Sequence, residues 1–193
     1  MVKASSEKRD HADQEAAVLD FWFRELSPHD WFGAGAALDP TIEKRFGALH
    51  QEASGGALDH WAETPSGRLA LILILDQFSR HLYRGTPRAF AQDAKAQRLA
   101  VEGIDAGVDE QLTFAQRQFF YMPLMHAEDA ALQRASIERF DALAGVAAEL
   151  CRYAQQHQDD IIRFGRFPSR NDALNRPSSV EELTFLSERK ASW

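Results

Sequence analysis

Hydrophobic residues recur along most of this chain at the three- and four-residue spacing typical of helices that bury one face. The first such pattern begins at Asp13 and ends at Ser27-Pro28. Asp39-Pro40 then predicts an N-cap followed by proline at the first helical position, in a helix that ends near Ala53. Further helical segments are predicted over residues 58–62, 86–106, 113–125, 127–142, 146–164 and 179–188. Gly145 is the predicted break in the long stretch after residue 126, and Ser179 with Glu182 predicts a capping box.

One apolar run is ambiguous by composition alone. Leu69 to Leu75 could form either a buried strand or a buried helix. We predict a helix over 68–83, because no second segment of similar character is present to pair with it as a strand. The chain is therefore predicted to be all-α, with about eight or nine helices in antiparallel pairs, arranged as an α-solenoid-like superhelix or an irregular bundle.

Length and charge narrow the class of protein. We expect a flexible tail over residues 1–9 and one helical domain over 10–193. The formal net charge of −7 disfavours a nucleic-acid partner held by overall charge. No apolar run is long enough to span a membrane, and no signal segment opens the chain, so we predict a soluble cytoplasmic protein. Cys151 is alone, which excludes an internal disulfide, and we expect it to be a small core residue.

Two helical segments carry polar side chains among apolar neighbours. Asp76 and Arg80 are four residues apart and can pair on one helix face. His126, Asp129 and Gln133 are predicted to share a face of a later helix. His157 and Asp160 repeat the His-x-x-Asp spacing, so His126, Asp129, His157 and Asp160 could together bind a metal ion. The alternative is a hydrogen-bonded network that locks helices together.

A loop rich in arginine and phenylalanine follows the longest helical stretch. Gly165 is placed to end the helix in the left-handed conformation, and Pro168 then stiffens the turn. The side chains of Arg166 and Arg170 would project from a rigid loop, which favours recognition of an anion. The same arginines could instead bind helix carbonyls and carboxylates and hold the loop down.

Recognised catalytic motifs are absent from the sequence. It contains no glycine-rich phosphate loop, no Gly-x-Ser-x-Gly and no His-Glu-x-x-His, so no cofactor is predicted and enzymatic activity is left open.

Four motifs in order resemble the bacterial family called domain of unknown function 924. They are Leu19-Asp20-Phe21-Trp22-Phe23, then residues 75–87 from Leu75-Asp76-Gln77-Phe78 to Thr86-Pro87, then Tyr121 to Asp129, and finally Arg163 to Asn171. The resemblance covers residues 15 to 187 and implies a bacterial protein with a tetratricopeptide-repeat-like helical fold and no assigned activity. The chain departs from the usual family pattern at Ser79, His81, Ser169 and Asn175, where Pro, Asn, His and Gly are frequent. Chemistry that depended on a histidine at position 169 is therefore not expected here.

Three hypotheses follow for function. The first is a binding module whose Arg-lined pocket takes a small anion, an acidic group or a peptide terminus, so the expected partner is a peptide, a protein or a small anionic ligand. Its predicted ligand-binding residues are Asp76, Arg80, His126, Asp129, Gln133, His157, Arg166, Arg170 and Asn171. The second is a metal-assisted hydrolase at the four His and Asp residues, and the third is a purely structural polar network. A homodimer is expected if Trp31, Phe32 or Trp61 is exposed.

Overall fold

The computed structural model describes residues 13–191, with side chains described as far as Glu188, and these residues form helices and turns with no strand. The predicted all-α class is confirmed, whereas the predicted tail over residues 1–9 lies outside the described residues. Contacts divide the chain into two compact units, of which the first ends at Asp141 and the second begins at Ala142. We call them unit 1 and unit 2, and the single domain predicted over 10–193 stays a prediction. No helix within the described residues is long and apolar enough to cross a membrane.

Unit 1 begins with helical residues that pack an aromatic face inward. Residues 13–20 are α-helical and continue into η1 (Phe21–Glu25), in which Phe21 and Trp22 are buried. The chain then forms α2 (Pro28–Gly33), η2 (Gly35–Leu38) and α3 (Asp39–Ser54). Ser27 caps α2, a helix that the sequence did not predict, because its hydroxyl and backbone form a capping box with Asp30. Asp39 opens α3 but does not cap it; its carboxylate instead binds His81 and Arg84.

The ambiguous apolar run forms the centre of unit 1 as a helix. It follows η3 (Asp59–Glu63) and consists of α4 (Pro65–Ile72), η4 (Leu73–Phe78) and α5 (Ser79–Leu82) in direct succession. Every residue from Leu69 to Leu75 is 0% exposed, which explains why no polar face interrupts the run. The segment η4 is a wider π-helical turn, a feature that is frequent at functional sites. It carries Asp76 into the interior.

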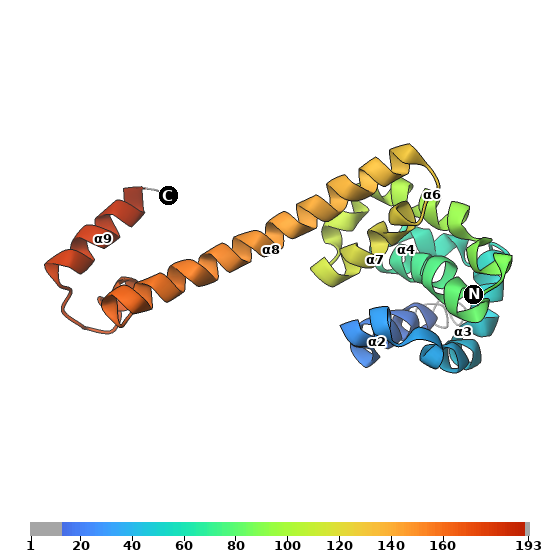
Figure 1. Cartoon of the computed structure of the whole chain (residues 1–193), viewed down its shortest axis with the longest axis horizontal. Coiled ribbons are helices and arrows are strands. Elements are labelled where there is room, and N and C mark those ends of the chain that lie inside the picture. The colour runs from blue at the N-terminus through green and yellow to red at the C-terminus, as the bar shows by residue number, and fades with distance from the viewer. Residues whose placement is uncertain (1–12, 192–193) are drawn as a thin grey trace, which may run out of the picture. The chain divides into compact units, whose positions relative to one another are not determined.

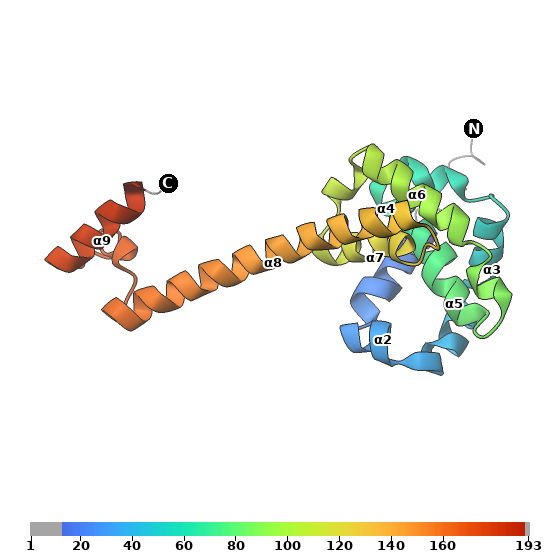
Figure 2. The same ribbon diagram turned by 45° about the horizontal axis from the view of Figure 1, so that its top comes forward.

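Later helices surround this centre (Figures 1 and 2). They are η5 (Pro87–Phe90), α6 (Asp93–Asp105), η6 (Val108–Gln111) and α7 (Phe114–Met125). The single helix predicted over 86–106 is therefore wrong, because turn residues separate η5 from α6. A Cβ added at Gly103 of α6 would lie 2.5 Å from the Phe120 ring of α7, so only glycine permits this close approach.

The aromatic residues of unit 1 form much of its core. Trp22 meets Phe119 edge-on with ring centroids 5.3 Å apart, and Phe78 lies 5.7 Å from the same indole. Trp61 is also buried, at 1% exposure, whereas Phe32 is 61% exposed. Of the aromatic residues considered for a dimer surface, Phe32 is thus the exposed one, and the dimer stays a prediction.

Unit 2 contains most of α8 (Ala130–Phe164), then η7 (Pro168–Arg170) and α9 (Val180–Ala191). The predicted break at Gly145 is wrong: α8 is one helix, because a lone glycine costs about 1 kcal/mol and nothing near it ends the helix. Gly165 does end the helix in the left-handed conformation, with φ 68°. Asn175 adopts φ 51°, a left-handed conformation that asparagine tolerates better than most residues other than glycine. Cys151 is exposed on α8 and is not the core residue that was predicted.

Candidate functional site

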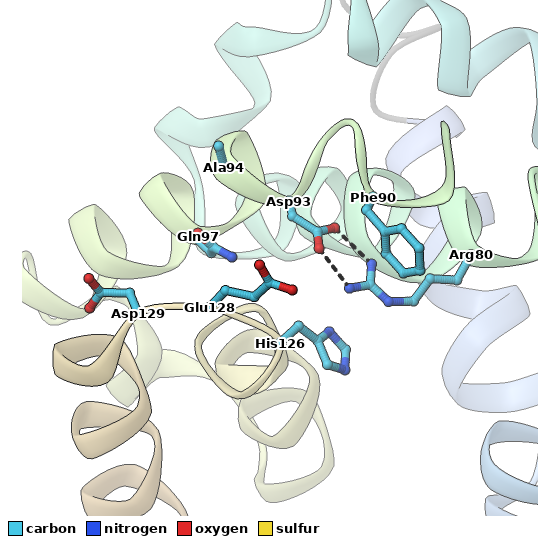
Figure 3. Close-up of a pocket in the computed structure, with 8 residues that line it drawn as sticks. All are labelled: Arg80, Phe90, Asp93, Ala94, Gln97, His126, Glu128 and Asp129. Carbon is cyan, nitrogen blue, oxygen red and sulfur yellow. Dashed lines mark hydrogen bonds and ion pairs between the residues drawn. The ribbon is translucent and has the colours of Figure 1, made fainter. Parts of the chain in front are cut away.

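A pocket of about 680 Å³ lies in unit 1 between two walls (Figure 3). One wall consists of η5, α6 and Arg80, and the other is the turn that joins α7 to α8. The lining residues are Arg80, Phe90, Asp93, Ala94, Gln97, His126, Glu128 and Asp129. We call this the His126 pocket. It contains three of the predicted ligand-binding residues, Arg80, His126 and Asp129.

The floor of the site is organised by Asp76, a carboxylate that is only 1% exposed. Its Oδ1 lies 2.9 Å from His126 Nδ1 and 3.0 Å from Arg80 Nη1. Gln77 Nε2 donates to its Oδ2 at 2.5 Å. A buried carboxylate is stable only when donors surround it, and here three side chains replace the lost water. The predicted pairing of Asp76 with Arg80 is confirmed.

His126 is the residue that this carboxylate orients. It lies at the C-cap of α7, where the chain leaves the helix and turns toward α8. A carboxylate accepts hydrogen bonds and cannot donate them, so Nδ1 must carry the proton that faces Asp76. In its neutral form the ring then presents the lone pair of Nε2. Because the side chain is 25% exposed and lines the pocket, this nitrogen is available to a ligand or a substrate.

Arg80 is held between two carboxylates. Its Nη1 and Nη2 each donate to Asp93 at 3.0 Å, in a bidentate pair that Figure 3 shows as dashed lines. The same guanidinium also bonds the Asp76 side chain and backbone carbonyl, and it lies 5.6 Å from the centre of the Phe90 ring. Its charge is therefore compensated and its position is fixed.

The remaining polar lining is acidic. Asp129 Oδ1 accepts from the backbone N–H groups of Ala131 and Leu132, which caps the start of α8. Glu128 is exposed and has no ion-pair partner among the described residues. With Asp93, three carboxylates line the pocket against one arginine whose charge is already shared.

Gln133 does not line the His126 pocket but supports it indirectly. Its amide donates to the carbonyls of Met125 and Ala127 at 2.8 Å each, so it braces the turn that carries His126. The prediction that His126, Asp129 and Gln133 share one helix face is wrong, because α7 ends at Met125 and α8 begins at Ala130.

The predicted site residues of unit 2 are largely paired within that unit. Arg166 binds both oxygens of Glu182, at 2.7 and 2.8 Å, and the carbonyl of Pro177 at 3.0 Å. The Glu182 carboxylate also accepts from the backbone of Ser179 in the predicted capping box. The hydrogen bond from Arg166 contributes most to holding the pKa of Glu182 at about 2. The alternative left open by the sequence, that this arginine holds the loop down, is the one observed.

The other residues of that loop are arranged around Phe167. Arg170 lies 4.4 Å from the centre of this ring, and His157 meets its edge at 5.6 Å. The Asn171 amide donates to Ser178 at 3.0 Å. Arg170 has no carboxylate partner among the residues described, in contrast to Arg166.

The metal hypothesis receives no support from the arrangement of ligands. Within residues 13–191 no three His, Cys, Asp or Glu side chains gather as a metal site would require. His126 binds Asp76 through Nδ1, and Asp129 Oδ1 accepts from the backbone of α8.

Sequence reasoning missed Phe90, Asp93 and Glu128 as lining residues. Glu128 could have been found, because it lies beside Asp129 in a motif already singled out. Asp93 and Phe90 carry no local signal, since their place in the site depends on how η5 packs beside α5 and how α6 packs beside η4.

Comparison with known proteins agrees with the resemblance seen in the motifs. A family described as bacterial protein of unknown function (DUF924) matches residues 18–190. A solved structure from Agrobacterium tumefaciens, of the protein of unknown function ATU0120, is similar with 39% sequence identity and a TM-score of 0.66. The match covers 92% of this chain and 98% of that one. No curated protein matches the chain.

Proposed function

Since the chain belongs to the DUF924 family of bacterial proteins of unknown function, we propose from its own site that it binds a small amine-bearing molecule in the His126 pocket. The observation that carries this proposal is the pair formed by buried Asp76 and His126, with Nδ1 and Oδ1 2.9 Å apart. This pair fixes one ring nitrogen and leaves the other to a ligand. Orienting a histidine by a buried carboxylate is a feature of sites that bind or react, because it sets the tautomer in advance.

The dimensions of the pocket support a small molecule. Ligand sites commonly enclose about 300–1,000 Å³, with apolar walls and a few fixed polar groups. The His126 pocket, of about 680 Å³, has the Phe90 ring on one wall and the His126 nitrogen on the other. Both polar anchors, His126 and Arg80, are held by hydrogen bonds before any ligand arrives, which lowers the entropy lost on binding.

The charge of the lining favours an amine over an anion. Asp93 and Asp76 already compensate Arg80, and Glu128 is left without a cation. An anion would meet the fields of Glu128 and Asp129, whereas an ammonium group would be attracted by both. The anion-binding hypothesis therefore loses its support at Arg80.

The test compares three ligands of one shape: benzylamine, benzyl alcohol and benzoate. Binding to the full chain would be followed at pH 7 through the NMR signals of the His126 ring. We expect benzylamine to bind best, and we expect Glu128→Gln to weaken it about three- to fivefold, the size of an exposed ion pair. Glu43→Gln, at an exposed glutamate of α3 outside the pocket, is the matched control. Preference for benzoate would refute the proposal.

A second candidate function is proton transfer by His126, which the same pair with Asp76 favours. The Nε2 lone pair could take a proton from water that attacks a bound ester or amide, and no Ser, Thr or Cys is present in the lining to act as a nucleophile instead. General-base catalysis typically contributes about 10²–10⁴-fold. Loss of p-nitrophenyl acetate hydrolysis in His126→Gln, with full activity in His29→Gln, would support this function. Equal rates in both variants would exclude it.

A further inference from the structure

A second, smaller pocket of about 220 Å³ lies in unit 1 where the end of α3 meets the turn after α5 and η5. Its lining residues are His50, Gln51, Ser54, Tyr83, Arg88, Ala91 and Gln92. We call this the His50 pocket. No carboxylate belongs to its lining, and the amides of Gln51 and Gln92 add uncharged donors.

The proton position on His50 follows from its hydrogen bonds. The ring is 3% exposed, and its Nε2 lies 2.7 Å from Ser79 Oγ. The single hydroxyl proton of Ser79 is donated to the carbonyl of Leu75 at 2.6 Å. Ser79 must then accept from His50, so Nε2 carries the proton and Nδ1 is left with a lone pair.

The lone pair of Nδ1 is nearly unused. Ser54 Oγ is 3.4 Å away, at the long end of the range for a hydrogen bond, and Ser54 itself lines the pocket. Burial, with a smaller contribution from the positive charge of Arg88, lowers the pKa of His50, so the ring stays neutral at pH 7. The pocket therefore presents an acceptor from a rigid and buried side chain.

Arg88 supplies the opposite kind of group. Its guanidinium lies over the Tyr83 ring at 4.0 Å from the centroid, which fixes the plane of the fork. No carboxylate pairs with it among the described residues of the chain. Stacking on an aromatic face leaves the N–H edges free, and these are the edges that bind oxyanions.

We propose that the His50 pocket binds a small oxyanion that carries a proton, of which hydrogen phosphate is the simplest example. Arg88 donates to its charged oxygens, and its remaining hydroxyl donates to His50 Nδ1. A volume of about 220 Å³ is several times the share of one water molecule, about 30 Å³, so an ion of this size fits. The site is separate from the His126 pocket and shares no lining residue with it.

The acceptor on His50 predicts a choice between two similar ions. Phosphate retains at least one proton at pH 7, whereas sulfate has none to donate. Sulfate would place an unprotonated oxygen against the Nδ1 lone pair, which is unfavourable because two acceptors then face each other and only the Ser54 hydroxyl, 3.4 Å away, can donate to Nδ1. We therefore expect phosphate to bind more tightly than sulfate, although the two ions have the same shape.

Isothermal titration calorimetry of the full chain with inorganic phosphate at pH 7 tests the proposal. We expect saturable binding that Arg88→Gln weakens about tenfold or more, because a charge-assisted hydrogen bond is lost. Arg134→Gln is the matched control, at an exposed arginine of α8 that lines neither pocket, and it should leave the affinity unchanged. Arg88 is exposed, so its replacement should not disturb folding, and an unchanged melting temperature would verify this.

Three results would overturn the proposal. The first is the absence of saturable binding up to about 10 mM phosphate. The second is equal affinity of the wild type and Arg88→Gln for phosphate. The third is a loss of affinity in Arg134→Gln as large as the loss in Arg88→Gln. Sulfate is titrated in the same way, and an affinity equal to that of phosphate would overturn the role assigned to His50.

Discussion

The His126 pocket and the His50 pocket each place an arginine over an aromatic ring and a histidine against a fixed hydrogen-bond partner. In the His126 pocket the partner is the carboxylate of Asp76, and Arg80 is clamped between Asp76 and Asp93. In the His50 pocket the partner is the hydroxyl of Ser79, and Arg88 stacks on Tyr83 without a carboxylate. The residue types are similar, but only the His126 pocket contains carboxylates.

This difference shows that arginine content alone does not identify an anion site. A guanidinium attracts a ligand only with the charge that its neighbours have not already compensated. Arg80 was predicted to bind a ligand and is compensated, whereas Arg88 was not predicted and is uncompensated. The partners of an arginine therefore decide its function, and those partners come from the tertiary structure.

The largest expected effect is on the free energy of unfolding. It should differ between Asp76, which binds His126, and Ser79, which binds His50. Asp76→Ala removes the acceptor shared by His126, Arg80 and Gln77, and leaves the buried donors unpaired. We expect the free energy of unfolding to fall by about 3–5 kcal/mol. Ser79→Ala leaves one neutral donor of His50 unpaired, and we expect a smaller loss of about 1–3 kcal/mol.

Urea denaturation of the two variants at pH 7 measures this difference. Asp76→Asn retains the shape of the side chain and should lose less stability than Asp76→Ala. If Asp76→Ala is no less stable than Ser79→Ala, the charge of Asp76 is not what holds the His126 pocket together.

The helices were more predictable from sequence than the pockets, for a physical reason. Helix formation depends on neighbours three and four residues away, so the pattern over 68–83 and the cap at Ser179 could be interpreted locally. The failures came where a local signal is weak: Gly145 does not end α8, and Pro87 begins only a short turn before α6.

The site was predictable only where its contacts are local. Asp76 and Arg80 pair at the four-residue spacing visible in the sequence. The bond from His126 to Asp76 spans 50 positions, and no sequence feature connects the two residues. The same holds for Arg88, since its lack of a carboxylate partner becomes visible only when α3, α5 and η5 are packed together.

A smaller effect, on the affinities for phosphate and benzylamine, is expected when the charge difference between the two pockets is removed. Asp93→Asn and Glu128→Gln together would take two carboxylates from the His126 pocket and release part of the charge of Arg80. With Arg88→Gln included to silence the other pocket, we expect affinity for phosphate to rise about tenfold and affinity for benzylamine to fall. The NMR signals of the His126 ring report both ligands.

The matched control for that variant carries Glu43→Gln in place of the two pocket substitutions. If benzylamine binding falls without any gain in phosphate binding, Asp76 alone is sufficient to compensate Arg80. The difference between the two pockets would then depend on the buried carboxylate of Asp76 and not on the three carboxylates that line the His126 pocket.

The smallest expected effect is the pH dependence that His50 gives to stability. Burial, and to a lesser extent Arg88, lowers its pKa in the folded protein below the ordinary value of 6.5. Above that value the ring is neutral in both the folded and the unfolded chain, so it has no effect. As pH falls below about 6.5, the unfolded chain binds a proton that the folded chain does not, and stability decreases by up to about 1.4 kcal/mol per pH unit.

Urea denaturation at pH 7 and pH 5.5 isolates this contribution. His50→Gln retains a donor for Ser79 but cannot titrate, so it should lose less stability than the wild type between the two pH values. Arg88→Gln should reduce the loss only in part, because burial is the larger cause of the lowered pKa. Glu182 does not interfere: its pKa is lowered to about 2 from an ordinary 4.5, so its contribution is lost only as pH falls below about 4.5. An identical loss in the wild type and His50→Gln would mean that folding leaves the pKa of His50 unchanged, so that burial does not keep the ring neutral below pH 6.5.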